Sequence, residues 1–448
     1  NYGPWDRLDG NEVFLGEKAK PLGAGFYPED MKKAEFEKWI IDHPEQAESF
    51  KSPFTLIARK DKGLEAIPYS KAYEGELTAA ARYLEDAAKL SRNKTFKRYL
   101  KSRAKAFLDN DYMQSDIDWM DLDSDIELTI GPYEVYEDAL MGYKAAFEAF
   151  VTIRDPEATK LLKTFSSWSG KLEKLLPMPK EYRNTKRGKS SPIVVVDLVF
   201  SGGDTRAGVQ TIAFNLPNDE RVREKKGSKK VLLRNVMFAK FERILQPISL
   251  KVLQPELIQF LNRDAFFNHT LMHEMSQGIG PGSIKTADGE QTTVSLALKE
   301  IYPHLEEAKA DILGLYNNLI LIDKKVERLK SNPAGDSKRR KLSKLEARKA
   351  TLATFLAGIF RSVRFGTDEA HGKANLLILN HLLKSEAITV DANGKFGMAF
   401  DKVDKAIRDC AHDILMIQAQ GDYKAGLQFI ETYGKRPEIL EKALKEFE

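Results

Sequence analysis

FFNHTLMHEMSQGIGPG, at residues 266–282, is the segment from which the architecture of this chain can be inferred. Its apolar residues recur every three or four positions up to the glycines, which predicts a helix that ends near Gly278. His273 and Gln277 are four residues apart and therefore lie on the same face of that helix. A metal or substrate bound at that face would meet both side chains.

The string resembles the H-E-x-x-H pattern, in which two histidines hold zinc and the glutamate acts as general base. His273 and Glu274 fit this pattern, but Gln277 stands in the second ligand position, and an amide oxygen is a weaker zinc ligand than imidazole. Taken alone, the string also fits a surface His-Glu pair. His269, four residues before His273, is either a half-buried helix histidine or a substitute ligand.

A second strong helix is predicted around LEEAKADILG at residues 305–314. A glutamate on a following helix is the usual third ligand of one class of zinc peptidase, and Glu307 is in that position. Asp311, one turn further, lies on the same face, where it can hold a ligand imidazole by a hydrogen bond. Alternatively, Glu306 and Glu307 are favourable charges in the first turn of a helix.

His371 lies in FGTDEAHGK, residues 365–373, where a loop leads into a predicted helix. Such a junction is a common place for a hydrogen-bond donor that stabilises a transition state. A simple helix cap explains a single histidine here equally well.

The rest of the chain predicts a mainly α fold with a small β portion. Strands are predicted at 192–201 and 208–214, as neighbours in one sheet, and a hairpin at 387–400 with a turn at 392–394. Helices are predicted at residues 31–50, 73–87, 95–109, 135–153, 161–176, 231–245, 255–277, 304–330, 338–360, 373–384, 402–418 and 437–447.

We expect five segments along the chain. They are an extended arm at 1–30, a mostly helical part of a first lobe at 31–190, a small sheet at 191–220, a helical metal-site lobe at 221–386, and a hairpin with C-terminal helices at 387–448.

Composition limits the possible functions of these 448 residues. Hydrophobic residues make up 42% and charged residues 30%, which is typical of a packed globular chain. A net charge of +4 gives no sign of nucleic-acid binding, and no apolar stretch is long enough for a membrane span. One cysteine, Cys410, is compatible with the cytoplasm. The start at Asn1 suggests a removed leader or a trimmed sequence.

The basic tract 324–349 predicts a solvated helical hairpin that turns at residues 331–335. Aromatic groups that could stack on bases are not interleaved with its charges, so we do not expect it to bind nucleic acid.

Together these residues resemble the dipeptidyl peptidase III family of zinc aminopeptidases, in particular its short bacterial members. The resemblance spans most of the chain and includes YGPWDRLDGNEVF at 2–14, IGPYEVYEDALMGYKAAFEAF at 130–150, FNLPNDE at 214–220, HEMSQGIGPG at 273–282, EEAKAD at 306–311 and EAHGKANLLIL at 369–379. It implies two lobes that flank a wide substrate cleft, a zincin-like helical catalytic lobe, and one Zn²⁺. It also implies release of dipeptides from the amino terminus of short peptides, and we expect a monomer.

The resemblance implies a role for each site residue. The zinc ligands would be His273, Glu307 and, in the position of the missing histidine, Gln277. Glu274 would be the base, Tyr136 would polarise the scissile carbonyl, and His371 would stabilise the transition state. Three groups would bind the amino terminus and backbone of the peptide: Glu134, Asn215 and Asn218. Three more would support the metal shell: Glu306, Asp311 and His269.

Two positions depart from the family pattern. Gln277 stands where the second ligand histidine belongs, and Asn375 stands near the place where longer members have an arginine. The first leaves two other functions open. One is a silent homologue that binds a peptide or small molecule in the same cleft. The other is a metal-free acid–base enzyme that uses Glu274, Tyr136 and His371 on a non-peptide substrate. Members of the family have also been labelled Nudix hydrolases, but the sequence contains no Nudix-like string.

Overall fold

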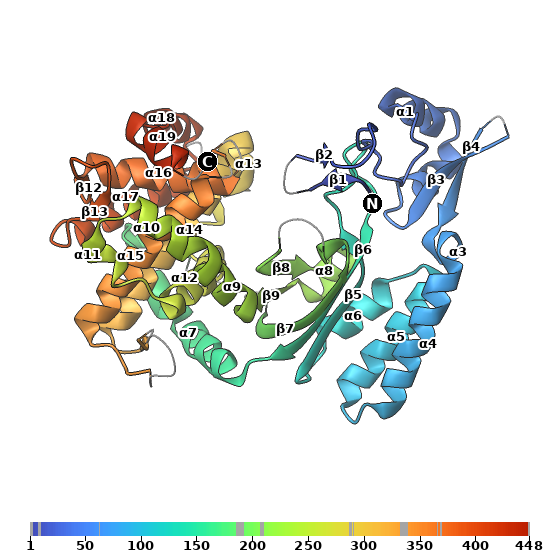
Figure 1. The fold of residues 1–448 in the computed structure, drawn as a ribbon, viewed down its shortest axis with the longest axis horizontal. Coiled ribbons are helices and arrows are strands. Elements are labelled where there is room, and N and C mark those ends of the chain that lie inside the picture. The colour runs from blue at the N-terminus through green and yellow to red at the C-terminus, as the bar shows by residue number, and fades with distance from the viewer. Residues whose placement is uncertain are drawn as a thin grey trace. The chain divides into compact units, whose positions relative to one another are not determined.

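The structure of this protein is a computed structural model, and it describes residues 3–7, 10–61, 63–184, 192–206, 210–285, 289, 291–331, 339–364, 366–367 and 370–446. By its contacts the chain divides into two compact units. The first comprises Asn1–Thr159 and Ser191–Val236, and the second Lys160–Ser190 and Met237–Glu448. Most of the chain is helical and a smaller part is β (Figure 1), so the predicted fold class is confirmed.

The first unit contains a five-stranded sheet, two small hairpins and several helices. Its strands are β1 (Trp5–Asp6), β2 (Glu12–Val13), β3 (Thr55–Lys60), β4 (Gly63–Pro68), β5 (Ile126–Glu134), β6 (Ala146–Arg154), β7 (Ile193–Gly203), β8 (Ala213–Leu216) and β9 (Lys229–Leu233). Its helices are α1 (Lys33–Asp42), α2 (Ala47–Lys51), α3 (Tyr69–Ala72), α4 (Glu74–Leu90), α5 (Lys94–Asp109), α6 (Met113–Met120) and α8 (Glu220–Lys226).

The large sheet has the strand order β5-β6-β7-β9-β8, and only β7 and β9 pair in parallel. Strand β6, AFEAFVTIR, alternates buried and less buried residues, as expected for a strand. The predicted helix at 135–153 is therefore wrong. Its aromatic residues Tyr143, Phe147 and Phe150 happen to be spaced like a helix face, although two of them belong to β6.

Two further predictions about the sheet are corrected. Strands β7 and β8 are not neighbours, because β9 lies between them. The helix predicted from residue 231 begins only at Arg234, since VLL at 231–233 belongs to β9. Residues 208 and 209, which were predicted to begin the second strand, lie outside the described residues.

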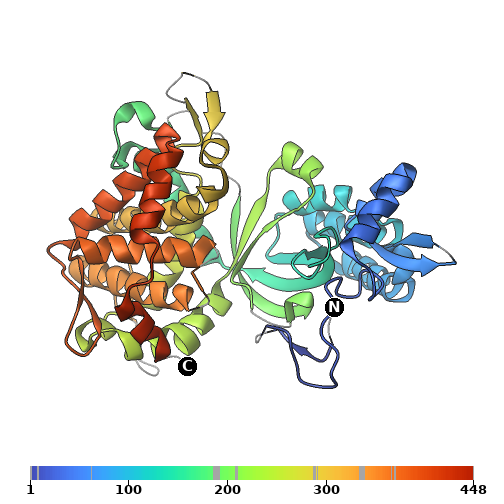
Figure 2. The ribbon, with the colours of Figure 1, turned by 90° about the horizontal axis from the view of Figure 1, so that it is seen from above.

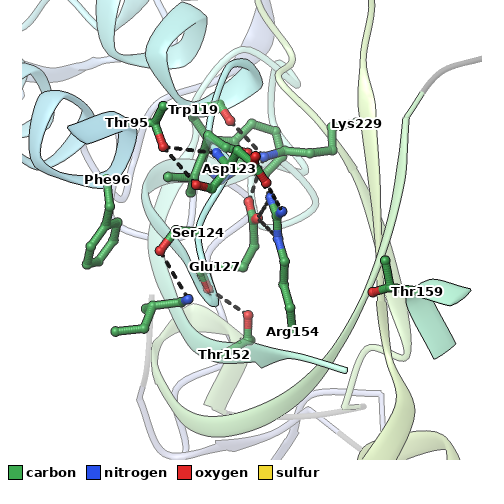
Figure 3. A network of polar contacts seen from close by, with 12 residues as sticks. Thr95, Phe96, Trp119, Asp123, Ser124, Glu127, Thr152, Arg154, Thr159 and Lys229 are labelled. Atoms are coloured by element: carbon green, nitrogen blue, oxygen red, sulfur yellow. Dashed lines mark hydrogen bonds and ion pairs between the residues drawn. The ribbon is translucent and has the colours of Figure 1, made fainter. Parts of the chain in front are cut away.

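A buried ionic network ties three strands of this sheet to helix α6 (Figure 3). The Glu127 carboxylate of β5 accepts hydrogen bonds from Lys229 Nζ of β9, at 2.6 Å, and from Arg154 Nη2 of β6, at 2.9 Å. Lys229 Nζ also donates to the backbone oxygen of Trp119 at 2.7 Å. Lys229 and Glu127 are both buried, so each charge depends on the other for compensation.

The second unit is a helical body with two small hairpins, shown mostly in yellow to red in Figures 1 and 2. Its elements are α7 (Pro156–Leu175), α9 (Arg234–Lys240), α10 (Gln246–Val252), α11 (Pro255–Ile258), α12 (Arg263–Ser276), α13 (Val294–Leu298), α14 (Tyr302–Asp323), α15 (Lys344–Val363), α16 (Ala370–Lys384), α17 (Val403–Gln420), α18 (Tyr423–Tyr433), α19 (Glu438–Lys445), β10 (Ser283–Lys285), β11 (Gln291–Thr293), β12 (Ile388–Val390) and β13 (Phe396–Met398). The first few residues of α7 and α9 belong to the first unit.

Helix α14 is the centre of this unit and packs against α12, α15, α16 and α17. Most of its residues are buried, including Asn317 and Asn318. A helix that is surrounded on all sides has little amphipathic pattern, because almost every face is apolar.

The basic tract does not form the predicted helical hairpin in its described part. Helix α14 ends at Asp323, and the chain returns through a backbone bridge between Lys330 and Lys341. Helix α15 begins after Ser343. Ser343 and Glu346 form a capping box, which provides hydrogen-bond acceptors for backbone N–H groups at the start of the helix. The predicted turn at 331–335 lies almost entirely outside the described residues.

None of the described helices combines the length and apolar character needed to cross a bilayer.

Candidate metal centre

Helices α12 and α14 lie unusually close where their predicted site residues face each other. A Cβ atom added to Gly314 of α14 would lie 3.1 Å from the backbone nitrogen of His273. That separation is tighter than ordinary van der Waals contact, so only glycine allows this approach without a shift. The contact places His273 of α12 opposite Glu307 and Asp311 of α14.

The His273 ring is fixed by a carboxylate on its inner side. Its Nδ1 lies 2.7 Å from Asp311 Oδ1, and Asn375 Nδ2 of α16 donates to Asp311 Oδ2 at 2.9 Å. The same amide also donates to the backbone oxygen of His371 at 3.0 Å. With its Nδ1 proton donated to Asp311, the imidazole presents Nε2 outward, the arrangement that outer carboxylates impose on metal-binding histidines.

Glu307 lies between two histidines. Its Oε2 is 3.3 Å from His273 Nε2 and 3.1 Å from His371 Nδ1. Burial raises the pKa of Glu307, but the two imidazoles outweigh burial and lower it to about 2. Burial opposes protonation of His273, but Asp311 and Glu307 outweigh it and raise the pKa of that ring well above its usual value. Glu307 also raises the pKa of His371.

These donors fit two ligands of a tetrahedral zinc ion. Two zinc bonds of about 2.0–2.1 Å at a tetrahedral angle place their donor atoms about 3.3 Å apart. The 3.3 Å between His273 Nε2 and Glu307 Oε2 matches that spacing. Glu307 Oε2 is buried, and in the described part of the chain no hydrogen bond of normal geometry reaches it. No three His, Cys, Asp or Glu side chains of the described residues form a complete metal cluster.

Gln277 caps the C-terminal end of helix α12, about one turn after His273. Its backbone N–H donates to the His273 carbonyl at 3.1 Å, and its own carbonyl accepts from Lys309 Nζ at 3.3 Å. Glu274 is half-buried on the same turn. Glu306 binds Lys309 at 2.8 Å and accepts from Gln418 Nε2 at 3.0 Å. Glu306 thus holds the lysine that fixes the end of α12.

His269 lies beside Asp311. Its Nε2 is 3.6 Å from Asp311 Oδ1, and its ring meets the edge of the Phe355 ring at a centroid distance of 5.0 Å. Its Nδ1 is buried and has no hydrogen-bond partner among the described residues.

The predicted peptide-binding residues belong to the first unit. Glu134 ends β5, and its Oε1 accepts from the backbone N–H of Tyr136 at 3.0 Å. The side chain of Tyr136 is 87% exposed. Asn215 is an exposed residue of the edge strand β8, and Asn218 Nδ2 donates to the Tyr133 carbonyl at 3.0 Å. Burial raises the pKa of Glu134.

Three residues of the centre had no role in the sequence prediction: Asn375, Lys309 and Gly314. Asn375 follows His371 by four residues on α16, and Lys309 lies between Glu307 and Asp311 on α14. Their spacing on these helices was a usable signal. The role of Gly314 depends on which helix packs against it, and that is not visible in the sequence.

The sequence model of Peptidase family M49 matches residues 51–292 of this chain. The chain belongs to peptidase family M49. Peptidases of this family are generally zinc-dependent. The match includes β5, β8 and the whole of α12, and therefore covers Glu134, Asn215 and His273.

Three known proteins are similar to this chain. The structure of DPP III from Caldithrix abyssi is 50% identical, with a TM-score of 0.90 over 100% of this chain and 82% of that one. Dipeptidyl-peptidase III from Corallococcus sp. strain EGB is 42% identical, with a TM-score of 0.73 over 99% of this chain and 80% of that one. Nudix hydrolase 3 from Arabidopsis thaliana is 37% identical over 498 residues, and this M49 chain spans 62% of its length.

Proposed function

We propose that this chain is a zinc-dependent dipeptidyl peptidase that releases dipeptides from the amino terminus of short peptides. The observation that supports this most directly is the cluster of His273, Glu307 and Asp311. It combines two donor atoms at zinc-ligand spacing with a carboxylate that orients the imidazole. The two solved structures of DPP III and dipeptidyl-peptidase III, which this chain resembles along almost its whole length, support the same activity.

The ion would be held by His273 Nε2 and Glu307, with the Gln277 amide as third ligand. Bound zinc supplies a Lewis acid that polarises the scissile carbonyl and lowers the pKa of water. Glu274, next to His273 on α12, accepts the proton of the attacking water and passes it to the leaving amine. The ring of His371, whose pKa Glu307 raises, would donate a hydrogen bond to negative charge that develops on the substrate oxygen.

The first unit would bind the peptide. Glu134 pairs with the cationic amino terminus, and the amides of Asn215 and Asn218 bond to the peptide backbone. Tyr136 is exposed, and its hydroxyl can donate a hydrogen bond to the scissile carbonyl. Replacement of Glu134 by Gln should raise KM for free peptides and leave KM for N-acetylated peptides unchanged.

The deciding experiment compares this chain with Gln277→His. Metal content is measured by elemental analysis of protein purified without chelator, and dipeptide release is measured before and after chelation. About one zinc per chain together with activity that is lost on chelation supports the proposal. Zinc and activity only in Gln277→His would mean that Gln277 disables the site and that this chain is a silent homologue. Dipeptide release that survives chelation would contradict the proposal, because the reaction would then not depend on zinc.

A further inference from the structure

Asn375 of α16 links three helices of the second unit through a single side-chain amide. Its Nδ2 donates to Asp311 Oδ2 of α14 at 2.9 Å and to the backbone oxygen of His371 at 3.0 Å. The same nitrogen lies 3.3 Å from Ser362 Oγ of α15, a third acceptor. The residue is only 8% exposed, so these hydrogen bonds are largely shielded from water.

The orientation of this amide follows from the chemistry of its neighbours. A carboxylate and a backbone carbonyl only accept hydrogen bonds, so the NH₂ end of Asn375 faces both Asp311 and His371. The two N–H protons are enough for one bond to each of these oxygens. A flipped amide would place its own oxygen against two acceptors. Because the amide is neutral, it holds Asp311 without neutralising the charge that faces His273.

The carboxylate that Asn375 holds is part of the candidate metal centre. Asp311 Oδ1 lies 2.7 Å from His273 Nδ1, and His273 Nε2 lies 3.3 Å from Glu307 Oε2. The other bonded group, the carbonyl of His371, lies one turn before Asn375 on the same helix. The amide is therefore anchored on the backbone of α16 and reaches across to α14, where it restrains the carboxylate behind the imidazole.

We propose that Asn375 is a positioning residue of the metal centre, which fixes Asp311 and, through it, the imidazole of His273. Without the amide, Asp311 Oδ2 would lose a donor and the carboxylate could rotate. The imidazole would then be oriented less firmly, and its affinity for a metal would fall. This role rests on the proposed function, because it assumes that His273 binds zinc, but one of its two tests needs no metal.

Asn380, on the same helix, supplies a matched control. Its Nδ2 also donates to two oxygens, the backbone carbonyls of Tyr433 at 2.6 Å and Lys435 at 2.8 Å. Both amides therefore tie α16 to neighbouring segments, but the bonds of Asn380 lead to the end of α18 rather than to Asp311. A role of Asn375 that is merely structural would give the two residues the same effects.

The first test is the zinc affinity of the full chain, measured by competition with a chromophoric chelator. Asn375→Leu keeps a branched side chain without a donor, and the smaller Asn375→Ala covers the case in which leucine does not fit. We expect both variants to bind zinc about tenfold more weakly, the lower end of the usual range for outer groups of a metal site. Asn380→Leu should change the affinity by less than twofold. Thermal unfolding shows that each variant is folded.

The second test uses metal-free protein. The Nδ1 proton that His273 donates to Asp311 should give a downfield proton NMR resonance, which is assigned by its loss in His273→Gln. In Asn375→Leu and Asn375→Ala this resonance should shift or broaden, because the accepting carboxylate is no longer held. It should remain unchanged in Asn380→Leu.

The positioning role requires both changes. Zinc affinities of the Asn375 variants within twofold of the unmodified chain, an unchanged resonance, or no such resonance in the unmodified chain would overturn it. Equal effects of Asn375→Leu and Asn380→Leu would also overturn it. If the unmodified chain binds no zinc, the proposed function fails, and the resonance alone then decides whether Asn375 positions Asp311 and His273.

Discussion

Asp311 Oδ1 lies 2.7 Å from His273 Nδ1, and this contact sets which nitrogen of the ring faces Glu307. Asp311 is in turn held by Asn375, so the carboxylate cannot rotate freely. A network of this kind raises the basicity of a ligand imidazole and fixes its tautomer. The consequence for metal affinity can be measured separately from catalysis.

Asp311→Asn should therefore weaken zinc binding by about 10–100-fold, the usual effect of losing such an orienting carboxylate. The measurement is a competition titration against a chromophoric chelator. Asp323→Asn is the matched control, because Asp323 ends the same helix and pairs with Lys344 and Arg348 rather than with a histidine. Equal affinities of Asp311→Asn and the unmodified chain would contradict the role assigned to the contact.

Gly314→Ala should separate α12 from α14. The new methyl group would lie 3.1 Å from the backbone nitrogen of His273 and 3.3 Å from its Cα, and backbone cannot rotate away. We expect a shift of a few tenths of an ångström, a zinc affinity lowered by about tenfold or more, and a stability cost of about 1–3 kcal/mol that is partly offset by the helix propensity of alanine.

The control for this variant is Gly358→Ala on α15, where an added Cβ meets nothing within 4 Å. It should leave zinc affinity unchanged and raise the stability by about 0.5–1 kcal/mol, since alanine favours the helix. Zinc titration and calorimetric unfolding of both variants check the pair. If Gly314→Ala behaves like Gly358→Ala, the close approach of the two helices does not matter for the metal.

The helices of the second unit were largely predictable because their apolar residues repeat at helical spacing, and the residues of the candidate centre lie on three of them. The sheet was harder. The spacing of apolar residues in YKAAFEAF, residues 143–150, fits a helix as well as a strand. Residues 146–150 belong to strand β6 because they pair with β5 and β7, and this pairing cannot be read from the segment itself. Loop 135–145 is instead held by Asp138, which accepts backbone hydrogen bonds from Met141, Tyr143 and Lys144.

Other features depend on partners that are distant in sequence. Glu127, for example, pairs with Lys229 of β9 and Arg154 of β6, and neither lies near it in the sequence. The start of α15, by contrast, was available from the sequence, because Ser343 and Glu346 form a capping pair. This capping pair was not used in the prediction, because the many charged residues around it were interpreted as a solvated hairpin.

Lys229→Met tests the ionic network of Figure 3. The substitution keeps the length of the side chain but removes the partner of Glu127, which is 1% exposed, and the donor to the Trp119 carbonyl. Because Arg154 still compensates Glu127 in part, we expect a loss of about 2–4 kcal/mol in the free energy of unfolding. Chemical denaturation followed by tryptophan fluorescence measures it.

The comparison for this variant is Lys226→Met, which breaks an exposed ion pair with Asp121 and should cost less than about 1 kcal/mol. Glu127→Gln combined with Lys229→Met should recover part of the loss, since no buried carboxylate is then left without its lysine. A cost for Lys229→Met no greater than that for Lys226→Met would mean that the network is not stabilising.

Glu327 should make the second unit less stable as the pH rises. It is 3% exposed, its Oε1 accepts from Asn268 Nδ2 at 2.8 Å, and burial raises its pKa to about 8. Between its ordinary pKa and about 8 the unfolded chain loses this proton while the folded chain keeps it. The folded state then binds more protons, so this residue lowers the stability as the pH increases through that window, with no further change above it.

Glu327→Gln keeps an oxygen acceptor for Asn268 and removes the titration. Relative to the unmodified chain, it should have little effect on stability at pH 4.5 and should stabilise the protein at pH 8 by about 4 kcal/mol. Calorimetric unfolding at half-unit pH steps measures the difference. Glu346→Gln is the control, because Arg340 lowers the pKa of Glu346 to about 2, so its difference from the unmodified chain should change little between pH 4.5 and pH 8. A constant difference between Glu327→Gln and the unmodified chain over this range would show that Glu327 is already ionised in the folded protein.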